Sequence, residues 1–287
     1  MMLNHLTPKK IGTLAHLAML SEVSATPKPG LVDRATNGAH DDMDFFTFLA
    51  SATALRTSFD TFAELGRAHA AEPVTALLPH LQAAGIIAER EMFAATQGVN
   101  THKGMIFSLG LLAGVAGWAG ARGERITAEH LCELAAELTH GLTAAACAEA
   151  QRKPASERTK GEAMYVKYGV TGVRGEAERG FPLVSQVGLP RLREALSAGC
   201  SINDAGCAAL IALMAENTDT NVLHRSSLEA QRDLSARAAA LLHGNPFPGR
   251  EALSSMDADL IRQNISPGGS ADLLALCFFL YFLEEAD

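Results

Sequence analysis

The sequence predicts an all-α protein: one compact multi-helix domain spanning residues 1–287, with its active site in the loops between helices. Apolar residues recur at helical spacing, as Phe45, Phe48, Leu49 and Ala52 do. Alanine, the residue with the highest helix propensity, is abundant, and strand-like alternation of β-branched residues is nearly absent. Hydrophobic residues make up 48% of the chain, which is enough for a sizeable core.

The same spacing predicts eleven helices in chain order. Their expected ranges are 10–23, 42–66, 73–96, 104–120, 128–151, 156–168, 182–198, 202–216, 226–243, 250–263 and 270–284. The last one contains the longest apolar run, Leu273 to Leu283. That run is about half of the roughly 20 residues that cross a membrane, so we expect a buried helix.

Charge and cysteine content narrow the class of protein. Charged residues are 20% of the chain and the formal net charge is −8, which argues against a nucleic-acid or membrane-surface binder but allows a local basic pocket. The five cysteines form no C-x-x-C pair, which favours reduced, buried thiols. The N-terminal residues lack the pattern of a signal peptide, and we expect a cytoplasmic enzyme.

Glycine, proline and polar residues gather in a few stretches between the expected helices. These stretches are 26–40, 98–104, 171–182, 217–225, 245–249 and 266–270. Loops held by a rigid scaffold are where binding residues tend to lie.

The first stretch combines cations with carboxylates. Lys28 and Arg34 suit phosphate oxygens. Carboxylates at a loop–helix junction suit Mg²⁺, which prefers oxygen ligands, and the candidates are Asp33, Asp42 and Asp44. The alternative is that the acidic residues near 41–44 cap a helix N-terminus.

Two other stretches lead into strongly apolar helices. Gly98 and Gly104 permit close approach of a ligand to the backbone, and Lys103 adds charge, although the spacing is not that of a Walker A loop. Gly268 and Gly269 present free N–H groups ahead of a buried helix, which attract anions. The alternative for this second stretch is a simple capped turn with Ser270 as the N-cap.

The remaining stretches supply further candidates. Arg174 suits a phosphate, and Glu176 suits a metal ligand or a base, unless both belong to an exposed charged turn. Asp219 is a candidate ligand or base, and Asn221 and Arg225 are candidate ligand contacts.

Five segments taken in order carry a resemblance to one family. They read TPKPGLVDRATNGAHDDMDFFTF, GVNTHKGMIFSLGLL, GVRGEAERGFP, DTNVLHR and NISPGGSADLL. The chain from about Glu22 to its end resembles the triphosphoribosyl-dephospho-CoA synthases, which serve citrate lyase and malonate decarboxylase. In that family the arginine that matches Arg225 is usually followed by two glycines, whereas Ser226 and Ser227 follow here.

The resemblance implies a pentosyltransferase. The family joins ATP to 3′-dephospho-CoA and releases adenine, giving 2′-(5″-triphosphoribosyl)-3′-dephospho-CoA. This product is the prosthetic-group precursor of an acyl carrier protein, and a separate holo-acyl-carrier-protein synthase attaches it. The sequence leaves open which of the two pathways is served and whether the chain forms a homo-oligomer.

The reaction implied by the resemblance assigns expected roles to the candidates. The expected catalytic residues are Asp219, Glu176 and His102, with Asp219 preferred as the base. Mg²⁺ is expected on Asp33, Asp42 and Asp44. The expected substrate and phosphate contacts are Lys28, Arg34, Asn37, Asn100, Thr101, Lys103, Arg174, Asn221, Arg225, Gly268, Gly269 and Ser270.

Two other classes of function fit the residues. A helical metal-dependent hydrolase of nucleotides or ADP-ribose conjugates would use the same carboxylate-rich loops, with water in place of the hydroxyl. A helical scaffold for an acyl carrier protein or a lyase subunit would instead need an exposed apolar patch.

Overall fold

The computed structural model describes residues 6–244 and 247–286, so the first two residues of the expected loop 245–249 lie outside the described residues. Within them the chain is helical and has no strand. The elements are α1 (Pro8–Ser24), α2 (Phe45–Ala54), α3 (Arg56–Ala68), η1 (Val74–Leu77), α4 (Leu78–Ala95), α5 (Lys103–Ala121), α6 (Ala128–Leu138), α7 (Leu142–Arg152), η2 (Ala155–Glu157), α8 (Lys160–Tyr168), α9 (Gly172–Glu178), η3 (Val184–Gly188), α10 (Leu189–Ser197), α11 (Ile202–Glu216), α12 (Thr220–Arg225), α13 (Leu228–Leu242), α14 (Arg250–Arg262) and α15 (Gly268–Ala286).

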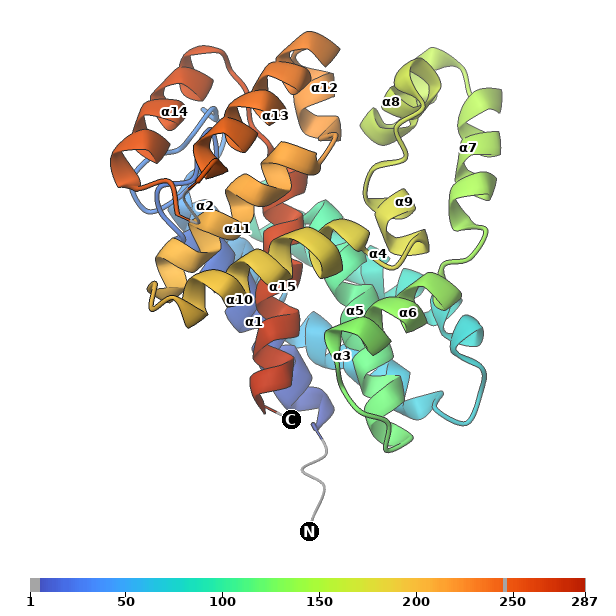
Figure 1. Ribbon diagram of the computed structural model, residues 1–287. Coiled ribbons are helices and arrows are strands. Elements are labelled where there is room, and N and C mark those ends of the chain that lie inside the picture. The colour runs from blue at the N-terminus through green and yellow to red at the C-terminus, as the bar shows by residue number, and fades with distance from the viewer. Residues whose placement is uncertain (1–5, 245–246, 287) are drawn as a thin grey trace.

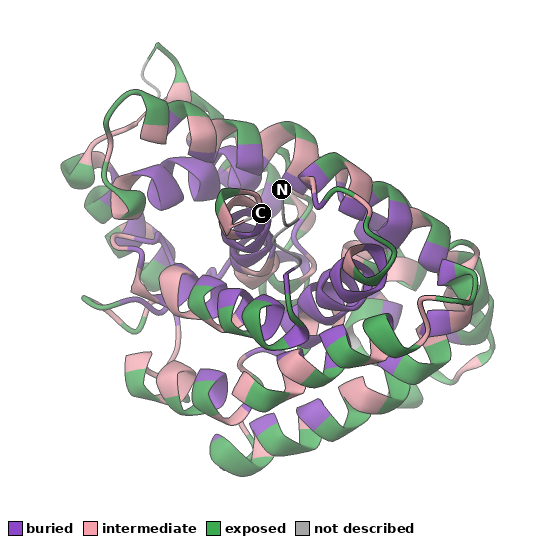
Figure 2. Ribbon diagram, turned by 90° about the horizontal axis from the view of Figure 1, so that it is seen from below, coloured by how far each residue is buried: buried purple, intermediate pink, exposed green. Residues whose placement is uncertain are grey.

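Helix α15 runs through the middle of the molecule and packs against α1, α5 and α11 (Figure 1). In Figure 1, α14 lies to the left of it and α7 to α9 lie to the right. Seen from below, the central helices are buried along most of their length, while the outer helices bury one face only (Figure 2). The apolar side chains from these helices form one contiguous core.

Helices α5 and α15 are apolar on all sides, as expected for helices surrounded by protein. Helix α5 is long and apolar enough to cross a membrane, but 78% of its apolar window is buried inside the bundle. Helix α3 approaches α5 closely because glycines face each other: a Cβ on Gly66 would lie 1.9 Å from the carbonyl oxygen of Gly114. The backbones of α3 and α5 therefore pack directly against each other, and larger apolar side chains fill the space around the contact.

The predicted helical class is confirmed, and the main differences are two expected helices that are divided and two expected loops that contain a short helix. The expected helix 42–66 is divided at Leu55 into α2 and α3, and the expected helix 128–151 is divided near Gly141. Helix α6 ends at Leu138, and Gly141, whose φ of +79° is left-handed, turns the chain into α7 as its N-cap. The stretches 171–182 and 217–225, which we expected to be loops, contain the short helices α9 and α12.

The thiols lie mostly in the core. Cys132, Cys207 and Cys277 are buried, and Cys147 and Cys200 are half-buried. Burial raises the pKa of the Cys132 and Cys207 thiols to about 12, so they stay protonated and unreactive at neutral pH.

Candidate active site

A cavity of about 460 Å³ is lined by residues from all five segments that carry the family resemblance, although these segments are far apart in the sequence. Its size falls within the roughly 300–1,000 Å³ of small-molecule sites. Ten of the expected site residues line it: Lys28, Asp42, Asn100, Thr101, Lys103, Glu176, Asn221, Arg225, Gly268 and Gly269. The packing of α5, α12 and α15 thus brings most of the predicted residues together.

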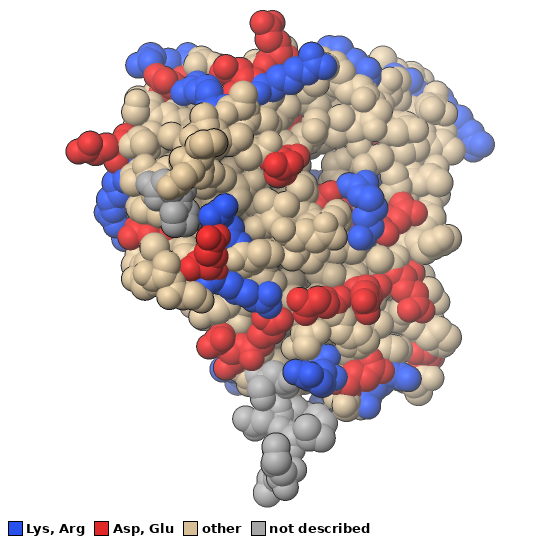
Figure 3. All heavy atoms as spheres, viewed as in Figure 1, with Lys and Arg blue, Asp and Glu red and all other residues tan. Residues whose placement is uncertain are grey.

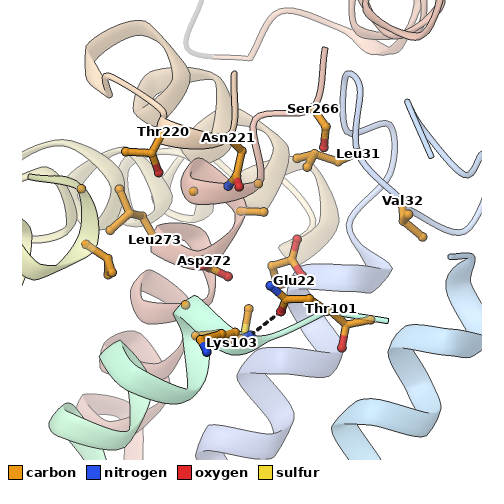
Figure 4. A pocket seen from close by; sticks show the side chains of 18 of the residues that line it. Glu22, Leu31, Val32, Thr101, Lys103, Thr220, Asn221, Ser266, Asp272 and Leu273 are labelled. Atoms are coloured by element: carbon orange, nitrogen blue, oxygen red, sulfur yellow. Dashed lines mark hydrogen bonds between the residues drawn. The ribbon is translucent and has the colours of Figure 1, made fainter. Parts of the chain in front are cut away.

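Two long helices begin at this cavity. The first residues of α5, Lys103 and Gly104, and the first residues of α15, Gly268 and Gly269, all line it. The first N–H groups of a helix have no partner within the helix and carry partial positive charge. Figure 4 shows Lys103 at one end of the cavity and Asn221 at the other. An anion bound between them could contact both side chains.

A buried ion pair forms part of the cavity wall. Lys28 Nζ donates a hydrogen bond to Glu22 Oε1, and the two side chains are only 2% and 3% exposed. Burial raises the pKa of Glu22 even though Lys28 opposes that shift. Lys28 therefore reaches the cavity, as expected for a phosphate contact, but much of its charge is already compensated.

Asp33 orders the loop that carries Lys28. Its carboxylate accepts hydrogen bonds from the backbone N–H groups of Lys28 (2.9 Å), Ala35 (2.6 Å) and Thr36 (3.0 Å). Asp257 of α14 fixes the same loop by accepting from Gly30 N at 2.8 Å. Asp33 is buried and does not line the cavity, so its placement supports a structural role rather than the expected metal ligand.

Asp219, the expected base, caps a helix. Its Oδ1 accepts from Asn221 N at 2.9 Å, and its Oδ2 accepts from Ser270 N at 2.9 Å and from Ser270 Oγ at 3.3 Å. It is 1% exposed and lies beneath Gly269 rather than on the cavity surface. Asp219 thus joins α12 to the start of α15, and its engaged oxygens do not support the expected role as base.

His102 lies behind the cavity wall. It is 1% exposed, its Nδ1 is hydrogen-bonded to Ser51 Oγ at 2.6 Å, and its ring meets Phe48 edge-on. Burial, with a smaller contribution from Lys28, lowers its pKa to about 3. His102 is therefore neutral at physiological pH and ties α2 to α5, which does not support the expected catalytic role.

Glu176 and Arg225 reach the cavity with partners of their own. Glu176 is paired with Arg179 Nη2 at 2.6 Å and accepts from Leu183 N at 3.2 Å. Arg225 donates to the carbonyl oxygen of Ala39, which holds the first polar loop against the end of α12.

Several expected residues lie outside the cavity. Arg34 lines a separate shallow hollow, where its Nε donates to the carbonyl oxygen of Ser24 at 2.6 Å. Asp44 is the N-cap of α2 and accepts from Thr47 N at 2.8 Å, which is the capping alternative. The residues that lie outside the cavity are Asp33, Arg34, Asn37, Asp44, His102, Arg174, Asp219 and Ser270. The two serines in place of the usual glycines also lie outside it, and Ser227 serves as the N-cap of α13.

The family is decided by comparison with known proteins. Residues 8–287 match the model of the CitG family, described as ATP:dephospho-CoA triphosphoribosyl transferase. The chain belongs to this family. The triphosphoribosyl transferases to which it is similar include 2-(5′′-triphosphoribosyl)-3′-dephosphocoenzyme-A synthase of Pectobacterium atrosepticum, which is 46% identical over 93% of this chain and 87% of that protein.

Other relatives have the same name, preceded by the word probable. A probable synthase of the same name from Vibrio cholerae is 44% identical over 97% of this chain and 89% of its own length. Another, from Streptococcus equi subsp. zooepidemicus, is 40% identical over 96% of this chain and 97% of its own. No solved structure matches the chain. These relatives support a transferase and give no support to the hydrolase.

Two carboxylates of this triphosphoribosyl transferase were missed by the sequence reasoning. Glu22 and Asp272 line the cavity, and Figure 4 shows Asp272 between Asn221 and Lys103 in that view. Both lie inside predicted helices, where an acidic residue is ordinarily read as solvent-facing. Their apolar neighbours were the available signal, because Glu22 precedes Val23 and Asp272 precedes Leu273 in helices that were expected to be buried.

Proposed function

We propose that the cavity at the N-termini of α5 and α15 transfers the triphosphoribosyl group of ATP to the 2′-hydroxyl of 3′-dephospho-CoA and releases adenine. The observation that carries this proposal is the meeting of all five family segments around one cavity. Figure 3 shows acidic and basic residues interspersed on one face of the molecule, without the basic stripe that a nucleic-acid ligand would favour.

The triphosphate is assigned to the side of the cavity where the long helices begin. Lys103 supplies a flexible cation, since its side chain is 52% exposed and, within the described residues, forms its ion pair with Glu89. The first turns of α5 and α15, which carry Gly104, Gly268 and Gly269, line the cavity and can offer backbone N–H groups to phosphate oxygens. Asn221 and Arg225 face the same space from α12.

Mg²⁺ is proposed to enter as part of the substrate, MgATP. The described residues contain no group of three or more histidine, cysteine or acidic residues placed to hold a metal. Mg²⁺ on a nucleotide needs only one or two protein carboxylates, because the phosphates and waters supply the rest. Of the three carboxylates expected to bind it, Asp42 is the one that lines the cavity.

We also propose that the chain, residues 1–287, acts as one catalytic domain, which the contiguous core of the described residues supports. We propose a cytoplasmic location for it. Its product would pass to a holo-acyl-carrier-protein synthase.

The test is a turnover assay with purified protein, ATP, Mg²⁺ and 3′-dephospho-CoA, followed by liquid chromatography and mass spectrometry. We expect adenine release that depends on dephospho-CoA and a product whose mass equals both substrates minus adenine. Adenine release without dephospho-CoA would show a hydrolase instead. Absence of both, from folded protein that binds ATP, would overturn the proposal.

A further inference from the structure

The carboxylates that line the cavity differ in whether another side chain already forms a hydrogen bond or an ion pair with them. Glu22 accepts a hydrogen bond from Lys28, and Glu176 is paired with Arg179. Asp42 is exposed and lies 3.3 Å from the ring of His40. Asp272 is half-buried, and no donor in the described part of the chain reaches its carboxylate. Among the cavity carboxylates that are shielded from solvent, it is therefore the one that no donor in the described residues engages.

The position of Asp272 is set by two helices. It lies one turn into α15, and its Oδ2 faces the bare backbone at the start of α5, so that a Cβ on Gly104 would lie 2.2 Å from it. The glycine leaves room for the carboxylate beside the first turn of α5. Since Asp272 already follows the first turn of α15, it is not needed as the N-cap of that helix.

The surroundings make an unpaired charge at this position costly. Burial raises the pKa of Asp272 well above its usual value, and the neighbouring carboxylates Glu22 and Asp219 raise it further. A neutral side chain of the same shape would fold at lower cost, because a buried charge without a partner is unfavourable. Once ionised, a carboxylate with a raised pKa accepts a proton more readily than an ordinary surface aspartate.

We propose that Asp272 is the catalytic base that accepts the proton of the 2′-hydroxyl of dephospho-CoA as this oxygen attacks the ribosyl carbon of ATP. This inference rests on the proposed function. A lone pair of the hydroxyl oxygen forms the new carbon–oxygen bond, and the O–H proton passes to the Asp272 carboxylate. The electron pair of the bond between ribose and adenine leaves with adenine, which takes up one proton. The proton gained by Asp272 equals the one that adenine needs, so no other acid or base is consumed.

The geometry of the cavity fits this assignment. Asp272 lies between Asn221 and Lys103 in the view of Figure 4, which places it beside the space given to the triphosphate. In a single displacement the attacking hydroxyl approaches the ribosyl carbon from the side opposite to adenine. We therefore expect dephospho-CoA to enter with its ribose over Asp272 and adenine of ATP to lie further from it.

The first test replaces the base without changing its shape. Asp272→Asn should lower the single-turnover rate at least about a hundredfold, while the dissociation constant for MgATP stays close to that of the unaltered protein and the melting temperature does not fall. Asp41→Asn is the matched control, because Asp41 is exposed, lies in a cavity-adjacent loop and does not line the cavity. It should keep the full rate.

A second variant separates a base from a merely structural group. In Asp272→Ala, added formate should restore the rate at least about tenfold by acting as the missing base, and the same formate should have no effect on Asp41→Asn. An Asp272→Asn rate near that of the unaltered protein would overturn the inference. So would a loss of MgATP affinity equal to the loss of rate, because Asp272 would then bind substrate. Failure of the unaltered protein to form product would instead overturn the proposed function.

Discussion

Asp272 and Gly104 lie against each other where α15 and α5 begin, with the carboxylate of one occupying the space that a side chain on the other would need. The contact joins two segments that are 168 residues apart in the sequence, counted from Gly104 to Asp272. A side chain after Lys103 would collide with this carboxylate, which gives a physical reason for the glycine at position 104 of this chain.

Gly104→Ala should therefore damage activity more than stability. The added Cβ would lie 2.2 Å from Asp272 Oδ2, so the carboxylate must turn away from its position. We expect the turnover number to fall at least about tenfold, since small misplacements of reacting groups are costly. The measurement is steady-state kinetics alongside thermal melting.

Gly85→Ala is the control for that change. Gly85 is also helical, and a Cβ there would meet nothing within 4 Å. It should leave activity unchanged and stabilise α4 by up to about 1 kcal/mol. Equal activity of the two alanine variants would contradict the role given to the contact between Gly104 and Asp272.

Breaking the buried pair of Lys28 and Glu22 should cost far more stability than breaking a surface pair. Both side chains are almost fully buried, so Lys28→Met leaves a buried carboxylate without its partner. We expect the free energy of unfolding to fall by about 3–5 kcal/mol, and much of this to return in the double variant Lys28→Met/Glu22→Leu. Denaturant unfolding measures both.

A surface pair supplies the comparison. Glu194, which pairs with Arg191 at 2.8 Å, has a side chain that is 57% exposed. Glu194→Gln should change the free energy of unfolding by less than about 1 kcal/mol. If Lys28→Met costs no more than this, the cavity wall does not depend on the buried pair.

Lys103 and Arg34 should differ in their effect on ATP binding. Lys103 lines the cavity with a flexible, half-exposed side chain, whereas Arg34 is held in a separate hollow. We expect Lys103→Gln to raise the dissociation constant for MgATP about tenfold, since hydrogen bonds to charged groups contribute about 1.5–3 kcal/mol. Arg34→Gln should change it less than about twofold by calorimetry. The reverse order would place the triphosphate outside the cavity.

Lys103 and Arg34 were both expected to contact phosphate from the sequence, yet Lys103 is the one that lines the cavity. Helical periodicity predicted the fold class and most helices, and the loop composition predicted the segments that meet at the cavity. Neither pattern predicted which side chains face the cavity. A carboxylate that caps a helix, such as Asp44, has the same sequence context as one that binds a ligand. Asp272 was missed for the opposite reason, since it lies within a helix that periodicity marks as core.

His102 should make stability depend on pH. Its pKa is about 3 in the folded protein and near 6.5 when unfolded, so between these values the unfolded chain binds more protons. Stability is then fully present above pH 6.5 and is lost as pH falls through this window, by up to about 1.4 kcal/mol per pH unit. His102→Gln should weaken that dependence, measured as the change in melting temperature between pH 7 and pH 5.

The control for this dependence is His243→Gln, because His243 is exposed on the surface. Its melting temperature should fall with pH as steeply as that of the unaltered protein. An unchanged pH dependence in His102→Gln would show that His102 is accessible to protons in the folded state.

The most direct measurement is a crystal structure of the Asp272→Asn variant with MgATP and 3′-dephospho-CoA bound together. We expect the triphosphate at the first turns of α5 and α15, and the 2′-hydroxyl of dephospho-CoA within about 2.6–3.2 Å of the side chain at position 272. A nucleotide bound outside this cavity, or a 2′-hydroxyl held away from position 272 by another carboxylate, would contradict it.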